Sequence, residues 1–327
     1  MASLDSTHPD ASAGARALPP RSFAQRLGLV SVPRDVLAQR YTQTGSKFID
    51  VMGAKVHYVD EGSSEGSAGD GEPIVMIHGF ASSLHTWDVV AAGLAREHRV
   101  IRLDLPPFGV TGPLRSARGA IETMNLPMYR RFIDTFMSAL GIRQATLVGN
   151  SLGGLISWDY AVRHRGAVKR LVLVDAAGFP MKLPVYIALF NHALVRLSAP
   201  WMLPEAIVKS AVRNVYGDPR KIDAVTLRRY VDFFHGEGTR EAIGKMVPTL
   251  DFADLDTDVL KTLDVPTLVL WGEKDRWIPP AHAADFAARI PGAKRVMYPG
   301  LGHIPMEEAP HQVLADLRAF FAGGTKA

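Results

Sequence analysis

A serine lies at the centre of a glycine-rich turn whose pattern is typical of a nucleophile. An apolar run at residues 145–148 leads into Gly149-Asn150-Ser151-Leu152-Gly153, and a helix-like segment follows directly. This order predicts a strand, a sharp turn and a helix, with the Ser151 hydroxyl exposed at the bend. The start of that helix would favour negative charge developing beside Ser151. Because the same motif also occurs by chance in ordinary turns, the interpretation depends on partners elsewhere in the chain.

A serine hydroxyl is a weak nucleophile and needs a neighbouring base, usually a histidine that a carboxylate orients. Asp275 follows a predicted strand at 267–271, and His303 follows another at 295–298. Side chains at the carboxyl ends of parallel strands meet at one edge of the sheet. We therefore expect Ser151, Asp275 and His303 to form a catalytic triad. Asp175, directly after a predicted strand at 170–174, is an alternative acid.

Catalysis by Ser151 also needs backbone N–H groups that stabilise an oxyanion. Leu152, the residue after the serine, would supply one of them. Phe80 would supply the other, since it follows the predicted strand at 74–77 within His78-Gly79-Phe80. The His78 side chain is expected to hold this loop by hydrogen bonds rather than to act as the base.

Strands and helices alternate along the chain and would position these residues. Further strands are predicted at 47–52, 55–60, 99–103 and 145–148, and helices at 87–96, 128–140, 152–164, 281–290 and 312–321. The first two strands form a pair around Gly53. Such alternation predicts an α/β fold with a mostly parallel sheet covered by helices on both faces. A loop rich in glycine, serine and acidic residues at 61–72 is expected to be flexible.

These motifs resemble those of the α/β-hydrolase family, from about residue 48 to the C-terminus. The resemblance rests on His78-Gly79-Phe80, on Asp104-Leu105-Pro106-Pro107-Phe108-Gly109, on the serine motif, on the turn from Gly272 to Asp275 and on Gly302-His303. The family order is serine, acid, histidine. Pro107 departs from the usual glycine of the second motif. A serine nucleophile speaks against haloalkane dehalogenases and epoxide hydrolases, which use aspartate there.

The resemblance implies a domain organisation. Residues 46–175 and 251–327 would form the hydrolase core, and residues 176–250 a helical cap over the active site. Residues 1–45 would be an N-terminal extension that is partly disordered, its first 20 residues being rich in alanine, serine and proline.

The cap segment (residues 176–250) is rich in large apolar side chains, including a predicted helix at 184–197. Phe179, Tyr186 and Phe190 are candidate substrate contacts, and His85 and Trp87 could line the entrance. The alternative is that these side chains only pack the cap onto the core. An exposed apolar cap would also suit contact with lipid or with a second subunit.

The expected function is that of a carboxylesterase or lipase-like enzyme acting on small to medium apolar esters, without a cofactor. One alternative is a carbon–carbon bond hydrolase of a meta-cleavage-type dienoate. That enzyme would need cations for the substrate carboxylate, and the cap offers Lys182, Arg196, Lys209 and Arg213. A second alternative is a non-enzymatic receptor that uses the same pocket to bind a ligand.

Composition excludes several other classes. The 327 residues are 47% hydrophobic and 21% charged, as in an ordinary globular protein, and the net charge of +4 is spread out, which gives little support to nucleic-acid binding. Cysteine is absent and the 11 histidines form no ligand cluster, so no metal site is expected. No apolar run is long enough for a membrane span or a secretory signal, and a cytoplasmic location is expected.

Overall fold

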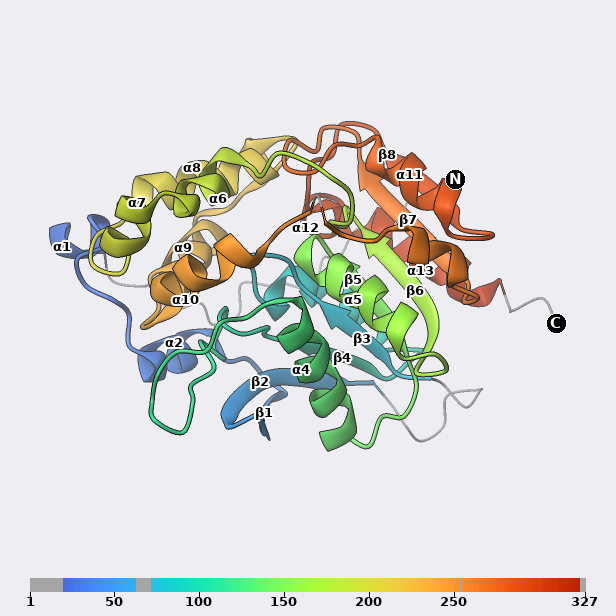
Figure 1. Cartoon of the computed structure of the whole chain (residues 1–327), viewed down its shortest axis with the longest axis horizontal. Coiled ribbons are helices and arrows are strands. Elements are labelled where there is room, and N and C mark those ends of the chain that lie inside the picture. Colours follow the sequence, from blue (N-terminus) through green and yellow to red (C-terminus); the bar gives the residue numbers. More distant parts are fainter. Residues whose placement is uncertain (1–19, 63–71, 253, 324–327) are drawn as a thin grey trace, which may run out of the picture.

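The structure, a computed structural model, describes residues 20–62, 72–252 and 254–323. An eight-stranded sheet runs through the middle of the described chain, in the order β1-β2-β4-β3-β5-β6-β7-β8 (Figure 1). β1 and β2 are antiparallel to their neighbours, whereas β4 through β8 pair in parallel. The strands are β1 (Ser46–Val51), β2 (Ala54–Glu61), β3 (Ile74–Ile77), β4 (Val100–Leu103), β5 (Ala145–Asn150), β6 (Val168–Val174), β7 (Thr267–Gly272) and β8 (Lys294–Tyr298). The predicted α/β architecture is confirmed.

Burial of the strands follows their place in the sheet. Every residue of β3, β4, β5 and β7 is buried, because helices cover both faces of a mostly parallel sheet. The edge strand β1 buries only Val51. β1 and β2 form the predicted pair, joined by Met52 and Gly53 with φ of 51° and 79°. The left-handed backbone suits glycine, which has no Cβ to clash.

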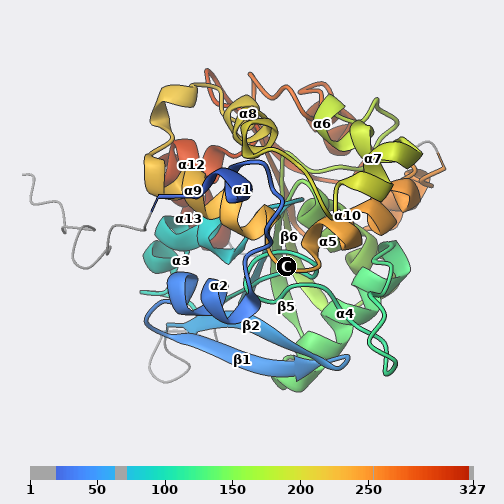
Figure 2. The same cartoon turned by 90° about the vertical axis from the view of Figure 1, so that its left-hand side faces the viewer.

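The α-helices that flank the sheet form two layers (Figure 2). α4 and α5 pack together on one face with the short helix η5 and α11, and α3 packs against α13 on the other. These helices are α3 (Asp88–Leu94), α4 (Leu126–Ala139), α5 (Leu152–Arg163), α11 (His282–Arg289), α12 (Pro305–Glu308) and α13 (Pro310–Ala322), with the 3-10 helices η1 (Leu84–Trp87) and η5 (Asp258–Thr262). α4 buries Phe132 and Phe136, four residues apart, as its periodicity predicts.

The cap segment lies between β6 and β7 in the chain, and all of its regular elements are helices. It contains α6 (Val185–Ala188), η2 (Leu189–Asn191), α7 (Ala193–Ser198), α8 (Glu205–Val215), η3 (Pro219–Lys221), α9 (Ala224–Phe234), α10 (Thr239–Met246) and η4 (Val247–Thr249). In Figure 1 these helices lie beyond one end of the central strands, on the side where β5 leads into α5.

The single helix expected at 184–197 is wrong. The chain breaks at His192, whose backbone is extended with φ −79° and ψ 127°. The break leaves carbonyl groups without helical partners. Arg196 compensates, because its Nη1 donates to the carbonyls of Phe190 and Asn191 at 3.2 and 2.6 Å. Periodicity alone could not reveal this interruption, since both halves keep apolar side chains.

The described part of the N-terminal segment packs on the cap segment. α1 (Phe23–Arg26) lies against α8, and α2 (Arg34–Tyr41) lies against α9. Arg21 is buried between Glu205 and Asp232, at 3.0 and 2.5 Å. Residues 1–19, and residues 63–71 of the loop expected to be flexible, lie outside the described residues.

Candidate active site

Ser151 sits at the junction of β5 and α5, on the turn that its motif predicts. Its backbone has φ 55° and ψ −116°, a conformation that a non-glycine residue rarely adopts. A Cβ on Gly149 would lie 2.3 Å from the Gly153 carbonyl oxygen, and one on Gly153 would lie 2.3 Å from the Ile77 carbonyl oxygen. Only glycine therefore allows strand and helix to approach this closely. The strained turn holds the Ser151 side chain at a pocket wall.

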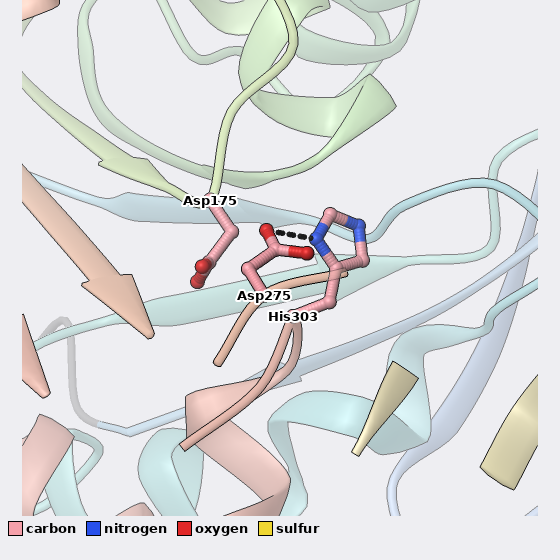
Figure 3. A group of neighbouring side chains, drawn as sticks. All are labelled: Asp175, Asp275 and His303. Carbon is pink, nitrogen blue, oxygen red and sulfur yellow. Dashed lines mark hydrogen bonds and ion pairs between the residues drawn. The ribbon is translucent and has the colours of Figure 1, made fainter. Parts of the chain in front are cut away.

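His303 and Asp275 contact one another beside this turn. His303 Nδ1 lies 2.7 Å from Asp275 Oδ2, and both side chains are buried (Figure 3). The other Asp275 oxygen accepts the backbone N–H groups of Trp277 and Ile278 at 2.7 and 3.0 Å. A carboxylate at Nδ1 places the ring proton there and leaves Nε2 as a hydrogen-bond acceptor. The pair can thus present a base to Ser151, which lines the same pocket as His303.

The loop that carries His303 is tied to three other segments. The His303 backbone N–H donates to the Val215 carbonyl of the cap segment at 2.7 Å. Its carbonyl accepts from Asn150 Nδ2 at 3.0 Å, which links it to the residue before Ser151. Glu308 accepts the N–H groups of Gly302 and Gly217. Sequence reasoning missed Asn150 and Glu308, although the position of Asn150 beside the serine was a signal for it.

Asp175, the alternative acid, lies on the other side of Asp275 from the imidazole (Figure 3). Its Oδ1 accepts the Gly272 N–H at 2.9 Å, and neither of its oxygens is hydrogen-bonded to His303. The two carboxyl groups and His303 each bring an atom within 4.8 Å of the others. The 2.7 Å contact between His303 and Asp275 is a hydrogen bond in which Nδ1 carries the proton, so this atom has no lone pair for a metal ion. The geometry therefore pairs His303 with Asp275.

The proposed oxyanion donors belong to two neighbouring loops. Leu152 is the first residue of α5, where backbone N–H groups have no acceptor within the helix. Phe80 follows β3, and both Phe80 and Ser151 line the same pockets. His78 holds this loop as predicted: its Nδ1 lies 2.7 Å from the Gly79 carbonyl, and its Nε2 accepts the Leu105 N–H at 2.9 Å. Burial lowers the pKa of His78, so the neutral ring persists.

Asp104 anchors the loops on either side of His78. Its carboxylate accepts the Leu84 and Val110 N–H groups, both at 2.8 Å, and contacts His57 Nδ1 at 2.8 Å. Burial opposes ionisation, but His57 prevails and holds the pKa of Asp104 well below its usual range. The aspartate of the motif at 104–109 thus supports the loop that carries Phe80.

Two apolar pockets meet at Ser151. The larger has a volume of about 70 Å³ and extends beneath the cap segment along Ile187, Phe190, Val208 and Val212. The smaller has a volume of about 30 Å³ and lies between Leu152, Ala177, Met181 and Ile278. Phe80, Ser151, Ile187 and Trp277 line both. Among the described residues, no lysine or arginine lines either pocket.

The expected substrate contacts divide into two groups. Tyr186 and Phe190 line the larger pocket, and the Tyr186 ring stacks on Trp277 with centroids 6.4 Å apart. His85, Trp87 and Phe179 line neither pocket.

These three side chains are buried elsewhere. His85 Nε2 lies 2.8 Å from the Tyr41 carbonyl, and burial lowers the pKa of His85 to about 4. Trp87 is fully buried in the core. Phe179 packs on Phe286 of α11 with ring centroids 4.6 Å apart. Their position in the chain, close to site residues, did not predict where the backbone would direct them.

The fold and this arrangement of residues define a hydrolase of the α/β class. A family model described as alpha/beta hydrolase fold matches residues 72–310, so the chain belongs to that family. It is 28% identical over 285 residues to Lipase 1 of Psychrobacter immobilis, covering 82% of this chain and 81% of that protein. It is 29% identical over 271 residues to 2-hydroxy-6-oxo-6-(2'-aminophenyl)hexa-2,4-dienoic acid hydrolase of Metapseudomonas resinovorans, covering 81% and 86%.

A solved structure shares the fold. The meta-cleavage product hydrolase from Pseudomonas fluorescens superposes with a TM-score of 0.71 at 23% identity, covering 84% of this chain and 97% of that one. No helix among the residues described here is long and apolar enough to cross a membrane.

Proposed function

We propose that this hydrolase cleaves carboxylic esters with apolar acyl or alcohol groups through an acyl-enzyme. The observation that carries the proposal is the buried contact between His303 and Asp275 beside the strained Ser151 turn, where two apolar pockets meet. The likeness to Lipase 1 agrees with this choice.

In the proposed reaction, His303 Nε2 takes the Ser151 hydroxyl proton while the serine oxygen attacks the ester carbonyl. The Phe80 and Leu152 N–H groups would stabilise the tetrahedral oxyanion. When the carbon–oxygen bond to the alcohol breaks, His303 returns the proton to the leaving alkoxide. A water molecule, deprotonated by the same histidine, then attacks the acyl-enzyme and releases the acid. No cofactor enters this scheme.

The carbon–carbon hydrolase remains the second candidate, favoured by the likeness to a dienoic acid hydrolase. Its substrate carries a carboxylate that would need a cation or several donors when buried. None of the four cations named in the cap segment lines either pocket. Two of them are engaged elsewhere: Arg196 binds the carbonyls of Phe190 and Asn191, and Lys209 pairs with Glu205 at 2.7 Å. Two uncharged pockets suit an ester better than a dienoate.

A panel of aryl esters with graded acyl length tests the proposal. We expect hydrolysis by the unaltered chain, covalent labelling of Ser151 by a fluorophosphonate, and loss of at least about 10⁴-fold in kcat for Ser151→Ala. Ser138→Ala, on the exposed side of α4, is the matched control. Full esterase activity in Ser151→Ala would overturn the mechanism. Cleavage of a ring-fission dienoate without turnover of any ester would favour the second candidate, and binding of ligands without any turnover would favour a receptor.

The outer face of the cap segment supports a further contact. Leu194, Trp201 and Leu197 are 81%, 77% and 72% exposed, and Met202 is exposed beside them. Large apolar side chains at this exposure are typical of surfaces that meet a lipid or another protein. Because Lys182 and Arg196 add positive charge to the same segment, we favour an anionic lipid surface over a second copy of the chain.

A further inference from the structure

A carboxyl group that the proposed mechanism does not use lies beneath the triad. Asp175 follows β6 with a fully buried side chain, and its backbone φ of 44° is in the left-handed region that few non-glycine residues occupy. One carboxyl oxygen, Oδ1, accepts the Gly272 N–H at 2.9 Å. The other, Oδ2, is buried and has no hydrogen-bond partner among the described residues. An unpartnered polar atom at this depth requires an explanation.

Negative groups surround Asp175. The Asp275 carboxyl lies within 4.8 Å of it, in the direction of His303 (Figure 3). The charge of Glu308 in α12 also acts on Asp175. The Tyr298 hydroxyl of β8 donates to Asp316 at 2.8 Å and not to Asp175. Among the described residues, no lysine or arginine forms an ion pair with Asp175.

The hydrogen bonds distinguish the two aspartates. Asp275 accepts three hydrogen bonds, from the Trp277 and Ile278 backbones and from His303 Nδ1. A carboxylate has about four acceptor sites, so one remains for a further donor. Asp175 accepts one hydrogen bond. Two buried carboxyl groups this close do not both ionise, and the better solvated of the pair keeps the charge. Burial, followed by the charge of Asp275, raises the pKa of Asp175 well above its usual range.

We propose that Asp175 is a neutral carboxylic acid whose Oδ2–H donates to the Asp275 carboxylate, making it a positioning residue for the triad acid. The proton satisfies the unpartnered Oδ2 and holds Asp275 from the side opposite His303. It also leaves a single negative charge to stabilise the imidazolium that forms during turnover. The effect on turnover rests on the proposed function, whereas the proton on Asp175 does not.

Infrared difference spectroscopy detects the proton without any substrate. We expect the carbonyl stretch of a protonated carboxyl group at neutral pH in the unaltered chain, and its loss in Asp175→Asn. Asp50→Asn, at an exposed position of β1, is the control that should keep the band. A spectrum of Asp175→Asn that retains the band, or an unaltered chain without it, would overturn the proposal. If no ester is cleaved but the band behaves as expected, only the proposed function fails.

Activity separates a positioning role from a purely structural one. Asp175→Asn keeps an acceptor for the Gly272 N–H and a donor for the Asp275 carboxylate, whereas Asp175→Leu has neither. We therefore expect kcat/KM of the leucine variant to be at least about tenfold lower than that of the asparagine variant. The acidic limb of the pH profile should stay in place in Asp175→Asn, because no charge is removed. A move of that limb to lower pH by about half a unit or more would show that Asp175 is ionised and would contradict the proposal. This comparison holds even if the leucine variant does not fold.

Stability gives a third readout. A carboxyl whose native pKa is raised keeps its proton at a pH where the unfolded chain has released it, so the native state loses stability as pH rises above about 4. The introduced asparagine has no titratable proton, so the Asp175→Asn variant does not lose stability in this way as pH rises. Its thermal midpoint, relative to the unaltered chain, should therefore rise between about pH 4 and pH 7. A difference that is independent of pH would contradict a raised pKa.

Discussion

His303 receives its orientation from several directions at the scale of single residues. Asp275 binds its Nδ1, and the Trp277 ring stacks beside it with centroids 5.9 Å apart. Val215 and Asn150 bind its backbone. Rotation of the ring would break the bond to Asp275, so the imidazole can hold one tautomer throughout the proposed reaction.

Replacement of Asp275 tests this orientation. We expect Asp275→Asn to lower kcat about 10³- to 10⁴-fold, because an amide can donate to Nδ1 and so favour the wrong tautomer. Circular dichroism should show an unchanged fold, and steady-state kinetics on an aryl ester measures the loss. A larger loss in Asp175→Asn than in Asp275→Asn would show that the acid has been assigned to the wrong aspartate.

At the scale of elements, the loops after β3, β5, β7 and β8 surround Ser151. The two pockets extend from Ser151 in different directions. His303 and Ile304 line only the larger pocket, whereas Leu152 and Ala177 line only the smaller. A general acid must reach the leaving oxygen, so the alcohol part of an ester belongs on the histidine side. The larger pocket would therefore hold the alcohol, and the smaller the acyl group.

Two isomeric esters distinguish these assignments. We expect kcat/KM for octyl acetate to exceed that for ethyl octanoate by about tenfold or more, since only the first places its long chain in the larger pocket. Val208→Trp, which narrows that pocket, should reduce turnover of octyl acetate more than that of ethyl octanoate. Met181→Trp, in the smaller pocket, is the matched variant and should do the reverse. A preference for ethyl octanoate would reverse the assignment.

The whole molecule presents two different surfaces. The hydrolase core encloses its sheet between helical layers, whereas the cap segment turns apolar side chains of α7 and the residues after it outward. The site opens beneath this same segment. A lipid surface that bound the cap would thus lie close to the route of an apolar substrate.

Vesicle flotation measures this contact. We expect the chain to float with phosphatidylglycerol vesicles more than with phosphatidylcholine vesicles, and the triple variant Leu194→Ser, Leu197→Ser and Trp201→Ser to bind at least about tenfold more weakly. The control is the double variant Phe48→Ser and Val89→Ser, which removes exposed apolar side chains from the surface of the hydrolase core instead of the cap segment. A concentration-dependent rise in mass by light scattering, without flotation, would assign the surface to a second copy of the chain.

The sequence by itself determined what depends on local patterns. Alternating apolar runs and helical periodicity identified the parallel sheet, and glycine spacing identified the turn at Ser151, because both signals lie within a few consecutive residues. The position of Asp275 and His303 after their strands predicted that they would meet, since parallel strands end at one edge.

Only the tertiary structure decided which residues share a site across long separations. It paired His303 with Asp275 rather than Asp175, brought in Asn150 and Glu308, and directed Phe179 into the core. It also broke the cap helix at His192, where Arg196 satisfies the released carbonyls. These outcomes depend on packing and hydrogen bonds between segments far apart in the chain, which no local pattern of residues contains.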